Sequence, residues 1–212
     1  MNTSKNISSS LFISLMLAIL FISCTNDIAN APDIDNKDVK LNSIEDLNLV
    51  VDNLNNVTSY GDLKKIHQNT SKVEKRKNSE LEKVLQPLIN EGKEFKNSLK
   101  ENSDKKRFKN GISDLNKKQT MLLGLVSLIH NELKKNNNSL KNKTISNVDG
   151  DKVVSCASAA LGVQSVKTII SGTAELMTAK TAVKIVKTVG KRYLGYVGVA
   201  IAVYEFTNCI SE

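Results

Sequence analysis

Apolar side chains recur at helical spacings, mostly of three, four or seven residues, through residues 71–135, and this repeat constrains the fold more than any other feature of the chain. In the first half they are Val73, Leu81, Val84, Leu85, Leu88, Phe95 and Leu99, and in the second half Phe108, Ile112, Leu115, Leu122, Leu125, Val126, Ile129 and Leu133. Such spacing places them on one face of a helix. Asn102-Ser103-Asp104 predicts a turn between the two stripes. The pattern therefore predicts two amphipathic helices, the second from about residue 105 or 112 to 135, packed antiparallel as a hairpin.

Local signals indicate where these helices begin and break. Thr70 or Ser71 can cap the first helix, and Glu74 stands three residues beyond Ser71, as a capping box requires. Pro87 should kink that helix or restart it. Gly61 is expected to break the chain upstream of it. Before Gly61, helical spacing over 41–57 predicts a further helix on the apolar residues Leu41, Ile44, Leu47, Val51 and Leu54. We assign residues 41–135 to one basic helical hairpin domain.

The last third of the chain has a different composition, in which charges thin out and small residues concentrate. Three helices are expected here, over about 152–174, 178–189 and 192–208, with Thr178 capping the second and Gly190 ending it. Residues 136–150 are polar and Asn-rich and are expected to be a linker. Aromatic residues make up only 4% of the chain and Trp is absent, which disfavours a β-sandwich. The predicted fold class is all-α, with the amphipathic helical hairpin followed by a small Gly/Ala-rich helical bundle over 151–212.

Two features of residues 151–212 bear on function. Lys180, Lys184, Lys187 and Lys191 recur at helical spacing and form a cationic ridge opposite apolar positions. The apolar run 193–206 would be roughly 21 Å long as a helix, short of the roughly 30 Å hydrocarbon core of a bilayer. It is either a buried central helix or, with tilt or bilayer thinning, a membrane-inserting one. In composition, residues 151–212 resemble the helical bacteriocins, and the resemblance implies insertion into target membranes while the ridge holds anionic headgroups.

The first 24 residues have the order of a secretory signal: a polar start with Lys5, an apolar run from residue 11 to 22, and a small residue before Cys24. The segment ends in Phe21-Ile22-Ser23-Cys24 and resembles a bacterial lipoprotein precursor, with Phe21 where that family usually has Leu. The resemblance implies that the signal peptide 1–23 is removed and that Cys24 is lipidated. In some bacteria an Asp directly after the lipidated cysteine holds a lipoprotein at the inner membrane. This chain has Thr25 there, so the resemblance favours the outer membrane or cell surface. The polar, acidic residues 24–40 then form a tether.

The remaining chemistry-bearing residues are few. The chain has three cysteines, and lipidation of Cys24 leaves Cys156 and Cys209 as an even pair. In an oxidising compartment an even pair predicts a disulfide, here closing a loop of about 50 residues. The alternative is two separate buried thiols. His67 and His130 lie far from both cysteines in sequence, and no C-x-x-C motif occurs, so no metal site is predicted. Since no nucleophile–base pairing or phosphate loop is found either, we predict no catalytic residue, no cofactor and no enzymatic activity.

The net charge of +8 is unevenly distributed. Residues 25–60 hold seven acids and two lysines, whereas residues 61–145 hold 20 Lys or Arg and ten acids. A basic surface can bind anionic lipid or an acidic protein, and the alternative is a solvated Lys-rich face. Nucleic acid is not an expected partner of an exported protein.

The sequence therefore predicts a non-enzymatic cell-envelope lipoprotein, anchored through Cys24, with a binding or interaction role. The alternative is a membrane-active, bacteriocin-like antibacterial effector that uses residues 151–212. A third possibility is a binding or immunity protein that recognises an acidic partner through the Lys-rich hairpin. No oligomeric state is predicted.

Overall fold

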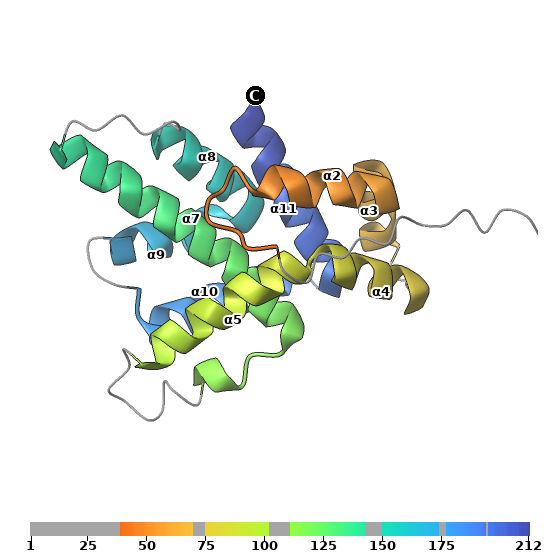
Figure 1. The fold of residues 1–212 in the computed structure, drawn as a ribbon, viewed down its shortest axis with the longest axis horizontal. Helices are drawn as coiled ribbons and strands as arrows, with labels where there is room; N and C mark the ends of the chain where they lie inside the picture. The colour runs from red at the N-terminus through yellow and green to blue at the C-terminus, as the bar shows by residue number, and fades with distance from the viewer. Residues whose placement is uncertain (1–38, 70–74, 102–110, 143–149, 174–176, 194) are drawn as a thin grey trace, which may run out of the picture. The chain divides into compact units, whose positions relative to one another are not determined.

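The computed structural model describes residues 39–69, 75–101, 111–142, 150–173, 177–193 and 195–212, all within one compact unit, Ile34–Glu212. Their helices are α2 (Leu47–Val57), α3 (Tyr60–Gln68), α4 (Lys75–Val84), α5 (Gln86–Glu101), α7 (Lys117–Asn142), α8 (Gly150–Leu161), α9 (Val163–Thr173), α10 (Ala179–Arg192) and α11 (Gly195–Ser211) (Figure 1). These residues contain no strand, and the predicted all-α fold class is confirmed.

Side-chain caps fix the start of three helices. The hydroxyl of Ser59 accepts a hydrogen bond from the backbone N–H three residues further on at 3.1 Å, and α3 begins directly after it. Asn116 and Gln119 each accept from the other's backbone N–H at 3.0 Å, which starts α7. Thr178 caps α10 in the same way at 3.3 Å, as the sequence predicts. The capping box predicted at residues 70–74 lies outside the described residues.

Several predicted helix limits are corrected. Gly61 lies inside α3, because the break falls at residues 58 and 59, where Ser59 caps the next helix. Gly190 lies inside α10, which continues to Arg192. The helix predicted over 152–174 is broken at Gly162, whose φ of +89° is left-handed and ends α8 before α9 begins. Pro87 does mark a restart, since α4 ends at Val84 and α5 begins at residue 86.

The second hairpin helix also differs from the prediction. Residues 111–113 are helical, but α7 begins only at Lys117 and then continues to Asn142, through half of the expected linker 136–150. Asn136 is buried there, so tertiary contacts hold a helix that the Asn-rich composition disfavours.

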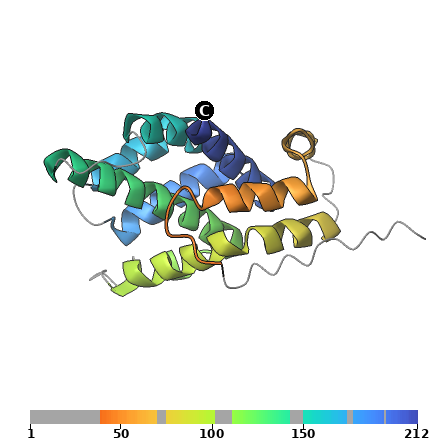
Figure 2. The same cartoon turned by 45° about the horizontal axis from the view of Figure 1, so that its top comes forward.

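Helices α5 and α7 pack closely, but they are not antiparallel. Both run in the same general direction and cross (Figures 1 and 2). The contacts that they make advance together along the two helices, from Glu91 with Ser127 to Phe95 with His130. Gly92 and Gly124 meet at the crossing. A Cβ placed on Gly92 would lie 3.0 Å from the Gly124 nitrogen, and one placed on Gly124 would lie 3.0 Å from the Gly92 nitrogen. Glycine at both positions is what allows the two backbones to approach.

A single hydrophobic core joins the two halves of the chain. Its buried residues run from Leu41 in the N-terminal half to Phe206 near the C-terminus. Helix α11 packs against α8 and α7, and also against α2, α3 and α4, so the predicted C-terminal bundle shares its core with the predicted hairpin domain. The segment 136–150 is therefore not a boundary between compact units, in contrast to the predicted division.

Candidate functional site

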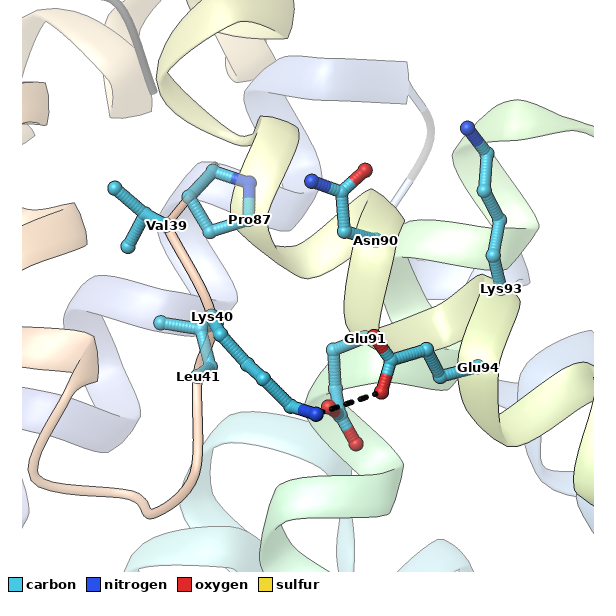
Figure 3. A pocket seen from close by; sticks show the side chains of 8 residues that line it. All are labelled: Val39, Lys40, Leu41, Pro87, Asn90, Glu91, Lys93 and Glu94. Atoms are coloured by element: carbon cyan, nitrogen blue, oxygen red, sulfur yellow. Dashed lines mark ion pairs between the residues drawn. The ribbon is translucent and has the colours of Figure 1, made fainter. Parts of the chain in front are cut away.

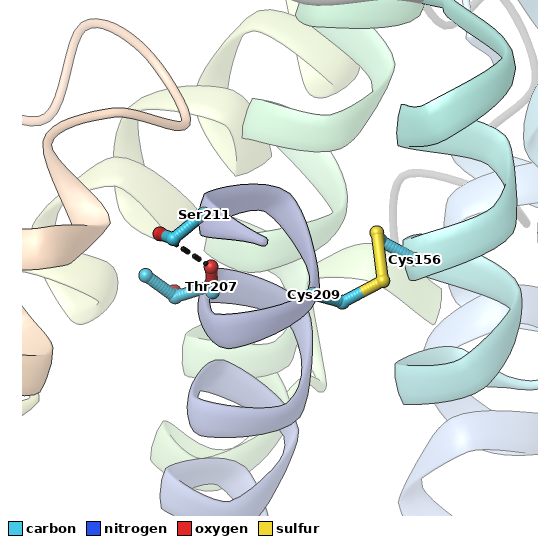
Figure 4. The surroundings of a disulfide bond; sticks show 4 residues. All are labelled: Cys156, Thr207, Cys209 and Ser211. Carbon is cyan, nitrogen blue, oxygen red and sulfur yellow. Dashed lines mark hydrogen bonds between the residues drawn. A yellow bond between two sulfur atoms is a disulfide. The ribbon is translucent and has the colours of Figure 1, made fainter.

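The two predicted partner cysteines are joined. Cys156 on α8 and Cys209 on α11 form a disulfide with a Cα–Cα distance of 5.4 Å across 53 residues of sequence (Figure 4). Cys156 is buried and Cys209 is half-buried. The bond attaches the last turns of α11 to α8, and closing a loop of this length stabilises the fold by about 4 kcal/mol in the chain-entropy model. Cys24, the predicted lipidation site, lies outside the described residues.

The predicted lysine ridge lies on the outside of α10. Its members are all exposed: Lys180, Lys184, Lys187 and Lys191. The opposite side of the helix is buried through Ala182, Ile185, Val186 and Val189. Thus α10 is strongly amphipathic, with one face in the core and one cationic face in solvent.

Helix α9 adds features that the sequence analysis missed. Val163, Lys167 and Ile170 follow one another at spacings of four and three residues, and all three are exposed. The spacing of these three residues is present in the sequence. The prediction of one continuous helix over 152–174 did not indicate that they lie on the exposed side of a separate helix. The break at Gly162 gives α9 its own orientation, with Ser165, Val166 and Ile169 on its buried side.

Helices α9 and α10 present one surface. They pack against each other and both pack against α7, and each has exposed side chains opposite its buried ones, so these neighbouring exposed sides are treated together. The Arg192 guanidinium at the end of α10 lies beside Gly162 at the start of α9, 3.9 Å from the position of a Cβ there. We call this surface the α9–α10 face. It is made up of six exposed cations, Lys167, Lys180, Lys184, Lys187, Lys191 and Arg192, and the apolar Val163 and Ile170.

The charge of this face is one-sided. The sequences of α9 and α10 contain those six cations and no Asp or Glu, and the loop between the two helices adds one acid, Glu175, outside the described residues. A concentration of one sign on one face attracts anions and sets the α9–α10 face apart chemically.

A pocket of about 370 Å³ lies between residues 39–41 and one side of α5 (Figure 3). Lys40 reaches across it to Glu94, and Glu91 lies beside them. Burial raises the pKa of Glu91, whose carboxylate accepts a hydrogen bond from the Ser127 hydroxyl at 2.7 Å. Two lysines and two glutamates line the pocket, so its charges balance and favour no particular ligand chemistry.

All four tyrosines of the chain make polar contacts that tie helices together. Their hydroxyls donate from Tyr60 and Tyr193 to Glu205, from Tyr196 to Glu82, and from Tyr204 to Asn55. Burial, and then the hydrogen bond to Glu82, raises the pKa of Tyr196 to about 12, so its hydroxyl stays protonated and donates at neutral pH. Because the contacts join α2, α3, α4 and α11, this network stabilises the fold.

The two histidines lie apart. His67 is exposed on α3, whereas His130 is buried in α7, 6.3 Å from the Phe95 ring between ring centroids. Across the part of the chain that the structure describes, no three His, Cys, Asp or Glu side chains gather as a metal site would require.

The apolar run near the C-terminus forms α11. Its residues from Val197 to Tyr204 are buried, together with Phe206. Within the described ranges, no single helix has both the length and the apolar character of a membrane span; α10 and α11 meet both criteria only as a pair, and they are bent by 101°.

Comparisons with known proteins add no relative: no family model matches the chain, and neither the curated proteins nor the solved structures contain a significant match.

Proposed function

We propose that this protein is a non-enzymatic lipoprotein of the bacterial cell envelope whose folded unit binds an anionic partner through the α9–α10 face. The signal-like residues 1–24 and Cys24 supply the anchor. The observation that carries the binding role is the exposure of six cations on two adjacent helices that contain no acid. Such a face raises the local concentration of anions and speeds their association.

The Cys156–Cys209 disulfide supports the compartment. Disulfides persist in oxidising environments, and they are rare where cytosolic reductants keep thiols reduced. An exported, anchored protein with a stable core and a one-sided cationic face fits a binding role at the envelope.

The second candidate is a membrane-active, bacteriocin-like effector. The observation in its favour is the pairing of cationic α10 with apolar α11, which together have the length and composition of a bent span. This activity requires α11 to leave the core, where its side chains contact helices from both halves of the chain, and the disulfide opposes that step. The binding role requires no such opening, and we therefore favour it.

The anchor is tested by the intact mass of the protein isolated from native membranes, before and after reduction. We expect loss of residues 1–23, added acyl chains on Cys24, and a gain of about 2 Da on reduction, since two thiols form from one disulfide. A full-length mass without acyl chains would refute the lipoprotein assignment.

The binding role is tested with the soluble chain 25–212, which contains the whole compact unit, on immobilised polyglutamate at low and high salt. Lys184→Glu with Lys187→Glu should abolish retention. The matched control, Lys83→Glu with Lys93→Glu, changes the net charge equally at exposed positions on α4 and α5 and should retain most of it. Equal losses from the two pairs, or retention that is insensitive to salt, would contradict recognition by the α9–α10 face.

A further inference from the structure

The α9–α10 face combines its cations with exposed apolar side chains. Three large hydrophobic side chains are exposed among the described residues: Leu49 at 46%, Val163 at 57% and Ile170 at 38%. Two of the three, Val163 and Ile170, lie on α9, with Lys167 between them on the same side of the helix. Exposed apolar residues within a cationic surface are a specific combination, because charge attraction alone does not need them.

This combination distinguishes between anionic partners. An acidic protein surface would pair with the lysines but would gain little from Val163 and Ile170 without an apolar counterpart. A bilayer supplies both, since its headgroups carry the negative charge and its acyl boundary accepts apolar side chains a few ångströms deeper. Lysines around the apolar residues can keep their charges at headgroup level while their aliphatic stems cover apolar surface.

We propose that the α9–α10 face docks on the surface of an anionic bilayer, with Val163 and Ile170 entering the headgroup–acyl boundary and the six cations meeting lipid headgroups. The proposal names the partner of the face and rests on the proposed function. The anchor makes the encounter geometrically feasible, because the fourteen residues 25–38 that separate Cys24 from the first described residue can extend to roughly 50 Å.

Docking leaves the core intact. Helix α11 stays buried and the Cys156–Cys209 bond stays closed, so binding should occur without permeabilisation. Interfacial docking and membrane insertion by α11 therefore give different results in the same vesicle experiment.

The absence of Trp from the chain permits a direct test. In the chain 25–212, Val163→Trp introduces a single tryptophan, which can be excited selectively, on the α9–α10 face, and Leu49→Trp introduces one at the exposed apolar site on α2. With vesicles containing phosphatidylglycerol, the indole introduced by Val163→Trp should shift its emission to the blue and become protected from acrylamide. The indole introduced by Leu49→Trp should show neither change. Vesicles of phosphatidylcholine alone should leave both spectra unchanged.

Binding of the same chain is measured by vesicle sedimentation. Lys184→Glu with Lys187→Glu should lower the partition coefficient by about thirtyfold or more, because removing each lysine costs about 1 kcal/mol and each new carboxylate is repelled by the anionic headgroups. Val163→Ser with Ile170→Ser should lower it by about tenfold or more, and Leu49→Ser should leave it unchanged. Val163→Ser alone should give a smaller loss in the same direction, which covers the case in which the double variant fails to fold.

The outcomes distinguish lipid docking from the more general proposal that the α9–α10 face binds an anionic partner. Lysine-dependent binding to both polyglutamate and vesicles, with no blue shift from Val163→Trp and no loss from the serine variants, would overturn lipid docking but leave anionic recognition standing. Dye release from the vesicles would overturn interfacial docking in favour of insertion. If the chain bound neither polyglutamate nor the anionic vesicles, both proposals would be overturned.

Discussion

Replacing Gly92 by alanine should weaken the fold at the crossing of α5 and α7. The new Cβ would overlap the carbonyl oxygen of Thr120 and would lie 2.8 Å from its carbonyl carbon and 3.0 Å from the Gly124 nitrogen. All of these atoms belong to the backbone of α7, so no side chain can rotate away. Relief requires the two helices to separate by on the order of 1 Å, and a gap of that size forfeits a quarter to a half of the dispersion energy of the atoms that it separates.

The net effect follows from two opposing terms. Overpacking against a rigid neighbour costs about 3 kcal/mol, at the upper end of the usual range. Alanine has a higher helix propensity than glycine, which stabilises the helix by about 1 kcal/mol. We therefore expect Gly92→Ala to lower the free energy of unfolding by about 2 kcal/mol, which corresponds to a fall in Tm of roughly 4–8 °C for a chain of this size.

The assay is urea and thermal unfolding of the chain 25–212, followed by far-UV circular dichroism. Gly61→Ala is the matched control, because it also replaces a glycine inside a helix but meets nothing closer than the Ser59 hydroxyl oxygen at 3.8 Å. That variant should stabilise the protein by about 0.5–1 kcal/mol. If Gly92→Ala were as stable as the parent chain, or gained stability as Gly61→Ala should, the close approach of the two backbones would be refuted.

Two further predictions concern covalent and ionisable groups. Replacing Cys156 and Cys209 together by serine should lower the free energy of unfolding by about 4 kcal/mol in denaturant titrations; a loss below about 1 kcal/mol would mean that the bond hardly constrains the unfolded chain. Burial raises the pKa of Glu91 above its unfolded value of 4.5, so its charge destabilises the fold above the folded pKa, and the penalty vanishes as the pH falls through 4.5. Glu91→Gln should therefore stabilise the protein at pH 7 and lose that advantage near pH 4 in unfolding titrations; an equal effect at the two pH values would contradict a burial penalty on the Glu91 charge.

The candidate site was only partly predictable. The spacing of Lys180, Lys184, Lys187 and Lys191 is a local property, and it correctly places these side chains on the exposed side of α10. Val163 and Ile170 were not singled out, because their exposure depends on where α9 packs. An apolar residue at helical spacing is usually on the buried side, and only the break at Gly162 and the contacts of α9 with α7, α8 and α10 leave these two in solvent.

Long-range contacts also decided that the apolar run near the C-terminus is buried in the protein core. Its composition suits either a buried helix or one that enters a membrane, because both environments select the same side chains. The structure surrounds α11 with α2, α3, α4, α7 and α8, and so buries it in the core. No local pattern in residues 193–206 specifies those partners.

By itself the sequence determined the all-α class and the cationic side of α10, and it predicted the pairing of Cys156 with Cys209 that the structure contains. These follow from helical periodicity, charge spacing and cysteine arithmetic, which are properties of neighbouring or few residues. Only the tertiary structure decided that the described residues from Leu41 onward share one core, that α5 and α7 cross in the same direction, and that the α9–α10 face carries apolar residues among its cations. The physical reason is that periodicity states which side of a helix is apolar, whereas the choice of its partner depends on backbone approach, as at Gly92 and Gly124, between residues far apart in the chain.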